Sequence, residues 1–214
     1  MLLADENVSS KGEFHSFTNV TSLPRPTQRP HPPFWIAATT TPETFAFAGK
    51  MGCKVMAIPL DPDKMRSLID TYREAWRAAG HPGNGHVMNT FFMYCAPTRE
   101  EAMATGLGPC NGHLKGLAVA AKEWLTGAST KDYPGYDKLI AHVTSDTVER
   151  QVQAGSAFIG SPADIVGMVR AYNDMVVGID NMSLHFAPSN MPVDAAESSL
   201  RLFSREVMPK LAMI

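Results

Sequence analysis

Short apolar runs alternate along this chain with longer segments in which apolar residues recur every three or four positions. The short runs have the length of β-strands, and they lie at 34–38, 53–58, 86–95 and 181–186. The longer segments are typical of amphipathic helices, predicted at 42–51, from about 61 to 80, from 98 onward, at 161–175 and at about 193–208. The chain therefore reads as four strand–helix units.

Residues at the expected helix ends support these boundaries. Thr98 and Glu101 have the spacing of a capping box, and Ser161 followed by Pro162 is a second helix start. Gly52 is placed to end the first helix as a left-handed cap.

Strands that alternate with amphipathic helices imply parallel strands joined by right-handed crossovers, and hence an α/β fold. The choice lies between a doubly wound sheet and a barrel. No GxGxxG or GxxxxGK[ST] motif follows any predicted strand, which speaks against a Rossmann or P-loop nucleotide domain. The strand at 86–95 is apolar except at Asn89 and Thr90, so we expect it to be buried on both faces.

Two segments stand apart from the strand–helix units. Residues 1–33 are polar and proline-rich, with a short hairpin expected around 11–14. They are either an extended connector to the first strand or a polyproline ligand, and their direct continuation into structured sequence favours the connector. Residues 105–156 contain helical stretches at 114–125 and 147–154, and we interpret them as a helical insertion within a domain at 34–214.

Three threonines, residues 39–41, stand between the first strand and the helix that begins with Pro42. The first backbone N–H groups of a helix have no intrahelical partner, and the helix dipole places positive potential there. Hydroxyl groups in the turn can donate further hydrogen bonds, so this junction suits a phosphate group. The alternative that Thr41 is only the N-cap of the helix stays open.

Composition and charge narrow the functional classes. With 214 residues, of which 44% are hydrophobic, the chain can bury the core of one domain. Its net charge of −2, without long runs of one sign, argues against nucleic acid or an acidic membrane as a partner. The three cysteines are widely spaced, and neither a signal peptide nor a membrane-spanning run is visible, so we expect a cytoplasmic protein.

The titratable residues do not define a catalytic centre. The histidines lack the spacing of metal ligands, and we expect no metal site. His185 either lines a pocket near Phe186 and Ser189 or is a packed core histidine. No Ser/His/Asp set can be assembled, so the catalytic residues stay unknown.

The segment at 30–38, followed by Thr41-Pro42-Glu43-Thr44 and by Ala-Gly-Lys-Met-Gly at 48–52, resembles the middle of the bacterial-luciferase-like flavin monooxygenases. Further residues before and after this segment stand in the same order as in that family. They are Gly12, Phe14, Phe17, Pro24, Pro26, Gln28, Tyr72, Arg73, Gly80, Gly160, Ser161, Pro162, Leu202, Phe203, Val207, Met208 and Pro209. The resemblance covers nearly the whole chain and depends on order and spacing more than on any single motif.

This resemblance implies a TIM-like (β/α)8 barrel that uses reduced FMN and O2 to insert one oxygen atom into a small organic substrate. It places flavin phosphate contacts at Thr40, Thr41 and Thr44. A freely exchanging reduced flavin implies a separate flavin reductase as partner. Two other functions stay open: a deazaflavin-dependent hydride-transfer oxidoreductase, and a non-catalytic flavin-binding or interaction module.

Family members carry four further strand–helix units before the segment that matches this chain. Four strands cannot close an eight-stranded barrel, and an open half would expose strand edges and apolar faces. We therefore expect the C-terminal half of a barrel, either as a fragment of a longer enzyme or as a short protein that pairs with another half or with a second copy.

Overall fold

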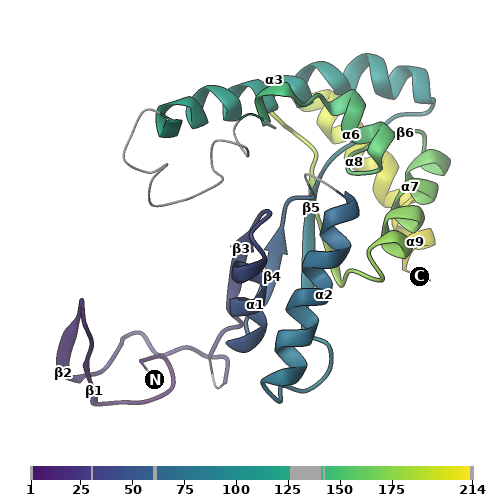
Figure 1. The fold of residues 1–214 in the computed structure, drawn as a ribbon. Helices are drawn as coiled ribbons and strands as arrows, with labels where there is room; N and C mark the ends of the chain where they lie inside the picture. The colour runs from purple at the N-terminus through teal and green to yellow at the C-terminus, as the bar shows by residue number, and fades with distance from the viewer. Residues whose placement is uncertain (1, 30, 60–61, 126–140, 142, 213–214) are drawn as a thin grey trace. The chain divides into compact units, whose positions relative to one another are not determined.

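The computed structural model describes residues 2–29, 31–59, 62–125, 141 and 143–212. The chain divides into two compact units, Met1–Trp35 and Ile36–Ile214 (Figure 1). In the first unit, strand β1 (Val8–Lys11) pairs antiparallel with β2 (Ser16–Val20). The Gly12 N–H closes the turn between them by donating to the His15 carbonyl oxygen at 2.9 Å. The predicted hairpin is therefore confirmed.

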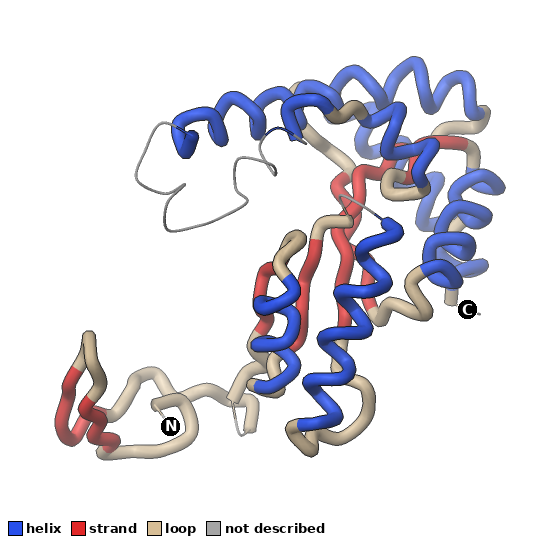
Figure 2. The backbone as a smooth tube through the Cα atoms, in the orientation of Figure 1, coloured by secondary structure: helices blue, strands red, loops and turns tan. Residues whose placement is uncertain are grey.

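The second unit is built on a parallel sheet whose central strand is β5 (Figure 2). Its strands are β3 (Trp35–Ala38), β4 (Lys54–Ala57), β5 (Val87–Cys95), β6 (Phe158–Gly160) and β7 (Asn181–His185). β4, β6 and β7 each pair with β5 and run parallel to it, while β3 lies next to β4. The four predicted strands are confirmed. Strand β6 was missed because three residues are too few to show a period.

The predicted helices are also present, as α1 (Pro42–Lys50), α2 (Pro62–Ala78), α7 (Pro162–Met175) and α8 (Val193–Glu206). Gly52 has a φ of 66°, as its role in ending α1 requires, and Ser161 forms the expected capping box. The last predicted helix, at about 193–208, ends at Glu206, and Pro209 does not continue it. Pro209 lies instead in the first turn of a short helix, α9 (Met208–Leu211), where a missing N–H is tolerated.

Helix α3 (Arg99–Leu125) runs without a break through the position where the sequence pattern was expected to change. It begins at the predicted capping box, in which Thr98 and Glu101 exchange two hydrogen bonds of 3.2 Å. Every fourth residue is buried along the helix, at Ala102, Gly106, Cys110, Leu114 and Ala118. This continuous stripe packs the helix on both sides of Pro109, so tertiary contacts offset the hydrogen bond that the proline removes. The described part of the predicted insertion continues with α6 (Val148–Ala154).

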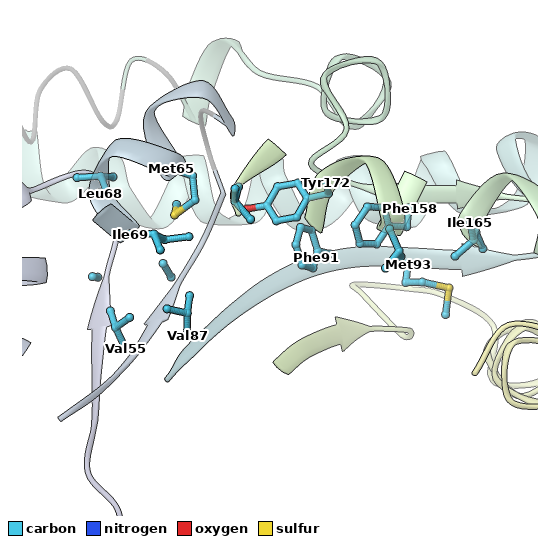
Figure 3. Packing of buried hydrophobic residues seen from close by; sticks show 14 of the residues in the cluster. Val55, Met65, Leu68, Ile69, Val87, Phe91, Met93, Phe158, Ile165 and Tyr172 are labelled. Atoms are coloured by element: carbon cyan, nitrogen blue, oxygen red, sulfur yellow. The ribbon is translucent and has the colours of Figure 1, made fainter. Parts of the chain in front are cut away.

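One face of the sheet is packed beneath helices and forms the core (Figure 3). The rings of Phe91 and Phe158 lie 4.4 Å apart, and Tyr172 of α7 meets Phe91 edge-on at 4.8 Å. Asn89 is fully buried on this face, where it accepts a hydrogen bond from the Tyr172 hydroxyl and donates to the Ala57 carbonyl oxygen, both at 3.2 Å. The expectation that β5 is buried on both faces holds only at its carboxyl end, where Met93, Tyr94 and Cys95 are all buried. Its alternate residues from Met88 to Phe92 are only partly buried.

Tyr72 and Arg73 of α2 hold the amino ends of the strands. The Tyr72 hydroxyl donates to the Cys53 carbonyl oxygen at 3.1 Å and accepts from the His86 N–H at 2.9 Å, just before β4 and β5 begin. The Arg73 guanidinium donates to the carbonyl oxygens of Val177 and Gly178, which precede β7. Both residues belong to the pattern that resembles the flavin monooxygenases, and their role here is structural.

Candidate functional site

The carboxyl ends of the parallel strands define the edge where ligands bind in α/β sheets and barrels. The half-exposed face of the sheet leads to this edge, and we call it the open face. Its side chains pair across neighbouring strands: Met56 lies opposite Met88, Thr90 opposite Ser183, and Phe92 opposite His185. In the described residues this face therefore mixes apolar and polar side chains, with Met56, Met88 and Phe92 beside Thr90 on β4 and β5, and Ser183 and His185 on β7.

At the end of β3, the predicted threonine turn leads into α1. Thr40 and Thr41 are exposed, and Thr44 is half-buried in the first helical turn. Thr41 occupies the N-cap position, but its hydroxyl makes no capping hydrogen bond, and only its carbonyl oxygen accepts from the Thr44 N–H at 3.1 Å. Thr41 is therefore the N-cap by position, as the sequence predicted, but its side chain does not cap the helix.

The donors in this turn fit a phosphate group. Thr40, Thr41 and Thr44 supply hydroxyls, and the first turn of α1 supplies positive dipole potential. Glu43 stands in the same turn and its charge opposes an anion. Its side chain is exposed, so water and salt screen that repulsion.

A cluster of three aromatic rings lies where β7 ends beside the carboxyl half of β5. We call it the ring cluster, and it consists of Phe92 on β5, His113 on α3 and His185 at the end of β7. The Phe92 and His185 rings stack at 5.7 Å, while His113 meets His185 edge-on at 4.7 Å and Phe92 at 5.6 Å. Each ring contacts the other two, so their orientations are fixed by mutual packing.

The electrostatics of the ring cluster favour a neutral imidazole at His185. Burial, and to a smaller extent the neighbouring His113, lower the pKa of His185. Its ring is therefore uncharged at neutral pH and can both donate and accept a hydrogen bond. Across the described residues, neither His113 nor His185 has a hydrogen-bond partner for its ring nitrogens.

Hydrogen bonds join helix α6 to the part of α3 that carries His113. The Asn111 amide donates to both carboxylate oxygens of Glu149, at 3.2 and 3.0 Å, and its oxygen accepts from the Val148 N–H at 3.0 Å. This amide is the main reason why the pKa of the Glu149 carboxyl is lowered. The arrangement fixes α3 two residues away from the ring cluster.

The sequence predicted only part of this site. The sequence left two alternatives for His185, a pocket near Phe186 and Ser189 or a packed core histidine. Phe186 packs against Phe203 at 5.5 Å, on the core side of the sheet. The partners of His185 are instead Phe92 and His113. The alternation along β5 would have placed Phe92 correctly once the strand pairing was known, whereas nothing in the sequence linked His113 to the sheet.

The described parts of the chain offer neither a metal centre nor a membrane-spanning helix. No group of three or more His, Cys, Asp or Glu side chains there is arranged to hold a metal ion. None of the helices described combines the length and hydrophobicity needed to span a membrane.

Comparison with known proteins agrees with this fold. A family model described as luciferase-like monooxygenase matches residues 1–178. The oxygenase component of the flavin-dependent trigonelline monooxygenase of Acinetobacter baylyi is 26% identical over 212 residues, which cover 92% of this chain and 54% of that protein. The chain belongs to the luciferase-like monooxygenase family, as its resemblance predicted.

Solved structures show the same similarity. The monooxygenase RslO1 from Streptomyces bottropensis superposes with a TM-score of 0.74 and 26% identity, over 98% of this chain and 57% of that one. The oxygenating constituent of 3,6-diketocamphane monooxygenase from Pseudomonas putida was solved in complex with FMN. It gives a TM-score of 0.66 at 20% identity, over 95% of this chain and 58% of that one. The fold is thus the α/β fold of the luciferase-like TIM-barrel enzymes, and the chain spans little more than half the length of these relatives.

Proposed function

We propose that this chain binds FMN, with the phosphate held by Thr40, Thr41 and Thr44, and that it acts in a flavin-dependent monooxygenase. The observation that carries the proposal is the N-cap hydroxyl of Thr41, which makes no capping bond to its own helix. A threonine at this position ordinarily satisfies a backbone N–H of the first turn. Here the hydroxyl stays available to an anion at the amino end of α1, where the helix dipole favours negative charge.

The chemistry of such an enzyme resides in the flavin. When bound, reduced flavin would supply the two electrons that let one oxygen atom of O2 enter an organic substrate while the other is released as water. The residues of this chain would hold the phosphate, orient the ring along the open face and exclude water. Because the relative from A. baylyi is an oxygenase component, we infer that a separate flavin reductase supplies the reduced flavin, within the cytoplasm.

The phosphate site can be tested by titrating FMN into the full chain and following quenching of flavin fluorescence. We expect Thr40→Val combined with Thr41→Val to raise the Kd for FMN about tenfold or more, since two hydrogen bonds to a charged group are lost. Thr71→Val is a matched control, because the Thr71 hydroxyl bonds only within α2, to the Ser67 carbonyl oxygen at 2.9 Å. Riboflavin, which lacks the phosphate, should bind both proteins equally.

An unchanged Kd for FMN in the double variant would contradict the phosphate site. If a deazaflavin bound in place of FMN, the hydride-transfer alternative would be favoured. Turnover is tested by adding a flavin reductase, NADH and trigonelline, and by measuring O2 consumption and transfer of labelled oxygen into the product. Tight FMN binding without oxygen transfer to any substrate tried would favour the non-catalytic flavin-binding module.

A further inference from the structure

The chain contains two Asn-Gly sequences, at 84–85 and 111–112. Asparagine is a chemically labile residue, and a glycine after it promotes loss of the side-chain ammonia, because no Cβ hinders attack by the next backbone nitrogen. The reaction needs a mobile side-chain amide and a backbone N–H that is not already bonded. The two sequences have opposite surroundings in the fold, so they should react at very different rates.

Asn84 lies in the loop between α2 and β5, and its side chain is exposed. Within the described residues, its amide makes no hydrogen bond, and the Gly85 N–H donates to no acceptor. The glycines on either side, Gly83 and Gly85, both have a positive φ, of 71° and 78°. Neither of the two reacting groups is therefore held in place by a hydrogen bond.

The fold itself requires the glycine that makes this sequence labile. A Cβ atom built at Gly85 would lie 2.4 Å from the Tyr72 hydroxyl oxygen, and the positive φ disfavours any other residue. The same hydroxyl joins α2 to the starts of β4 and β5, through the Cys53 carbonyl oxygen and the His86 N–H. A larger residue at position 85 would displace this junction.

Asn111 is protected in each respect in which Asn84 is not. Its amide nitrogen donates to both carboxylate oxygens of Glu149, at 3.2 and 3.0 Å, and its oxygen accepts from the Val148 N–H at 3.0 Å. Gly112 lies inside α3, where backbone N–H groups bond to the preceding turn. The helix must open and the amide must leave Glu149 before the two groups can react.

We propose that Asn84 is a site of spontaneous deamidation in the folded protein. The Gly85 backbone nitrogen gives up its proton and bonds to the side-chain carbonyl carbon of Asn84, while the bond from that carbon to the amide nitrogen breaks and ammonia leaves. Water then opens the cyclic imide to aspartate or isoaspartate. The net change replaces an amide by a carboxylate without oxidation or reduction, and it does not depend on the proposed function.

Isoaspartate at position 84 would also lengthen the backbone of a loop that is anchored at both ends. The Trp76 indole N–H donates to the Pro82 carbonyl oxygen at 2.9 Å, and the His86 N–H donates to the Tyr72 hydroxyl at 2.9 Å. An extra backbone carbon between these anchors shifts one of them. We expect the modified chain to unfold at a lower urea concentration than the fresh chain.

The test is to incubate the full chain in mildly alkaline buffer and to follow both sites by mass spectrometry of tryptic peptides, with enzymatic methylation to detect isoaspartate. Trypsin separates the two sites, because Arg99 lies between them. We expect Asn84 to react about tenfold faster than Asn111 or more, since opening hydrogen bonds to a charged group slows Asn111 by at least that factor. In concentrated urea the two rates should become similar.

Asn84→Ser is the matched control, because serine suits an exposed turn and cannot deamidate. Its urea midpoint should stay constant during the incubation, while that of the unmodified chain falls. If Asn84 keeps its amide in the folded chain over a period in which the unfolded chain converts, the proposed site is refuted. If Asn111 reacts as fast as Asn84 in the folded chain, the argument from their surroundings is wrong. If Asn84 converts and the urea midpoint does not move, the expected effect on the loop anchors is wrong.

Discussion

The contact between α1 and α2 depends on the absence of a side chain at Gly49. A Cβ atom built there would lie 2.3 Å from the Tyr72 carbonyl oxygen and 2.9 Å from the Trp76 backbone nitrogen. Ordinary van der Waals contact begins near 3.4 Å, so Gly49→Ala would require the two helices to separate by about 1 Å. Because the obstructing atoms are backbone, no rotation of a side chain can relieve the overlap.

The size of this effect follows from two opposing terms. Alanine in place of glycine inside a helix contributes about 1 kcal/mol of stability. Overpacking costs about 1–3 kcal/mol, and the upper end applies where backbone must move. We therefore expect Gly49→Ala to lower the free energy of unfolding by about 2 kcal/mol, which lowers the Tm of a chain of this size by roughly 4–8 °C.

Gly167 in α7 provides the matched control. No atom lies within 4 Å of a Cβ built at Gly167, so Gly167→Ala should raise the free energy of unfolding by up to about 1 kcal/mol. Both variants are measured by urea unfolding followed by circular dichroism, and by calorimetry. The reasoning is refuted if Gly49→Ala is as stable as the unmodified chain, or if the two substitutions change stability in the same direction.

Three further predictions concern polar and titratable side chains. Tyr172→Phe should lower the free energy of unfolding by about 1–2 kcal/mol in urea titrations, because the oxygen of the buried Asn89 loses its donor. The lowered pKa of His185 means that the unfolded chain binds its proton first, so stability should fall as pH drops below about 6.5, an effect measured by urea unfolding at pH 5 and 7. Burial raises the pKa of Cys95 to about 11 and that of Cys110 to about 12, so at pH 8 a disulfide reagent should label them only after unfolding.

Each of these predictions has an internal control. If Tyr172→Phe lowers the free energy of unfolding by the same amount in an Asn89→Leu background, the hydrogen bond between the two residues does not contribute to stability. His185→Gln should reduce the loss of stability at pH 5, and an unchanged loss would assign it to other groups. Cys53 is half-exposed and should react before Cys95 and Cys110, so simultaneous labelling of all three would contradict the burial argument.

Much of the local structure could be predicted from the sequence because its causes are local. The capping boxes at Thr98 and Ser161 act within three residues, and they begin α3 and α7 where expected. The threonine turn was recognised for the same reason, since a strand, a hydroxyl-rich turn and Pro42 are adjacent in the chain. What the sequence left open there was whether the Thr41 side chain caps its own helix, which depends on backbone geometry.

Pairing between distant segments was decided only by the tertiary structure. The burial of β5 on one face depends on which helices cover the sheet. Helix α3 continues through Pro109 because a stripe of buried residues packs on both sides of it, and the glycines in this segment hide that stripe in the sequence. The ring cluster joins residues 92, 113 and 185, whose proximity follows from strand register and helix packing. Sequence alone thus determined most of the strand–helix order and the start of α1, because these reflect neighbouring residues, and it determined the family through the order and spacing of residues along the chain. The three-dimensional packing alone brought His113 and Phe92 to His185, because contacts across so many residues leave no local pattern.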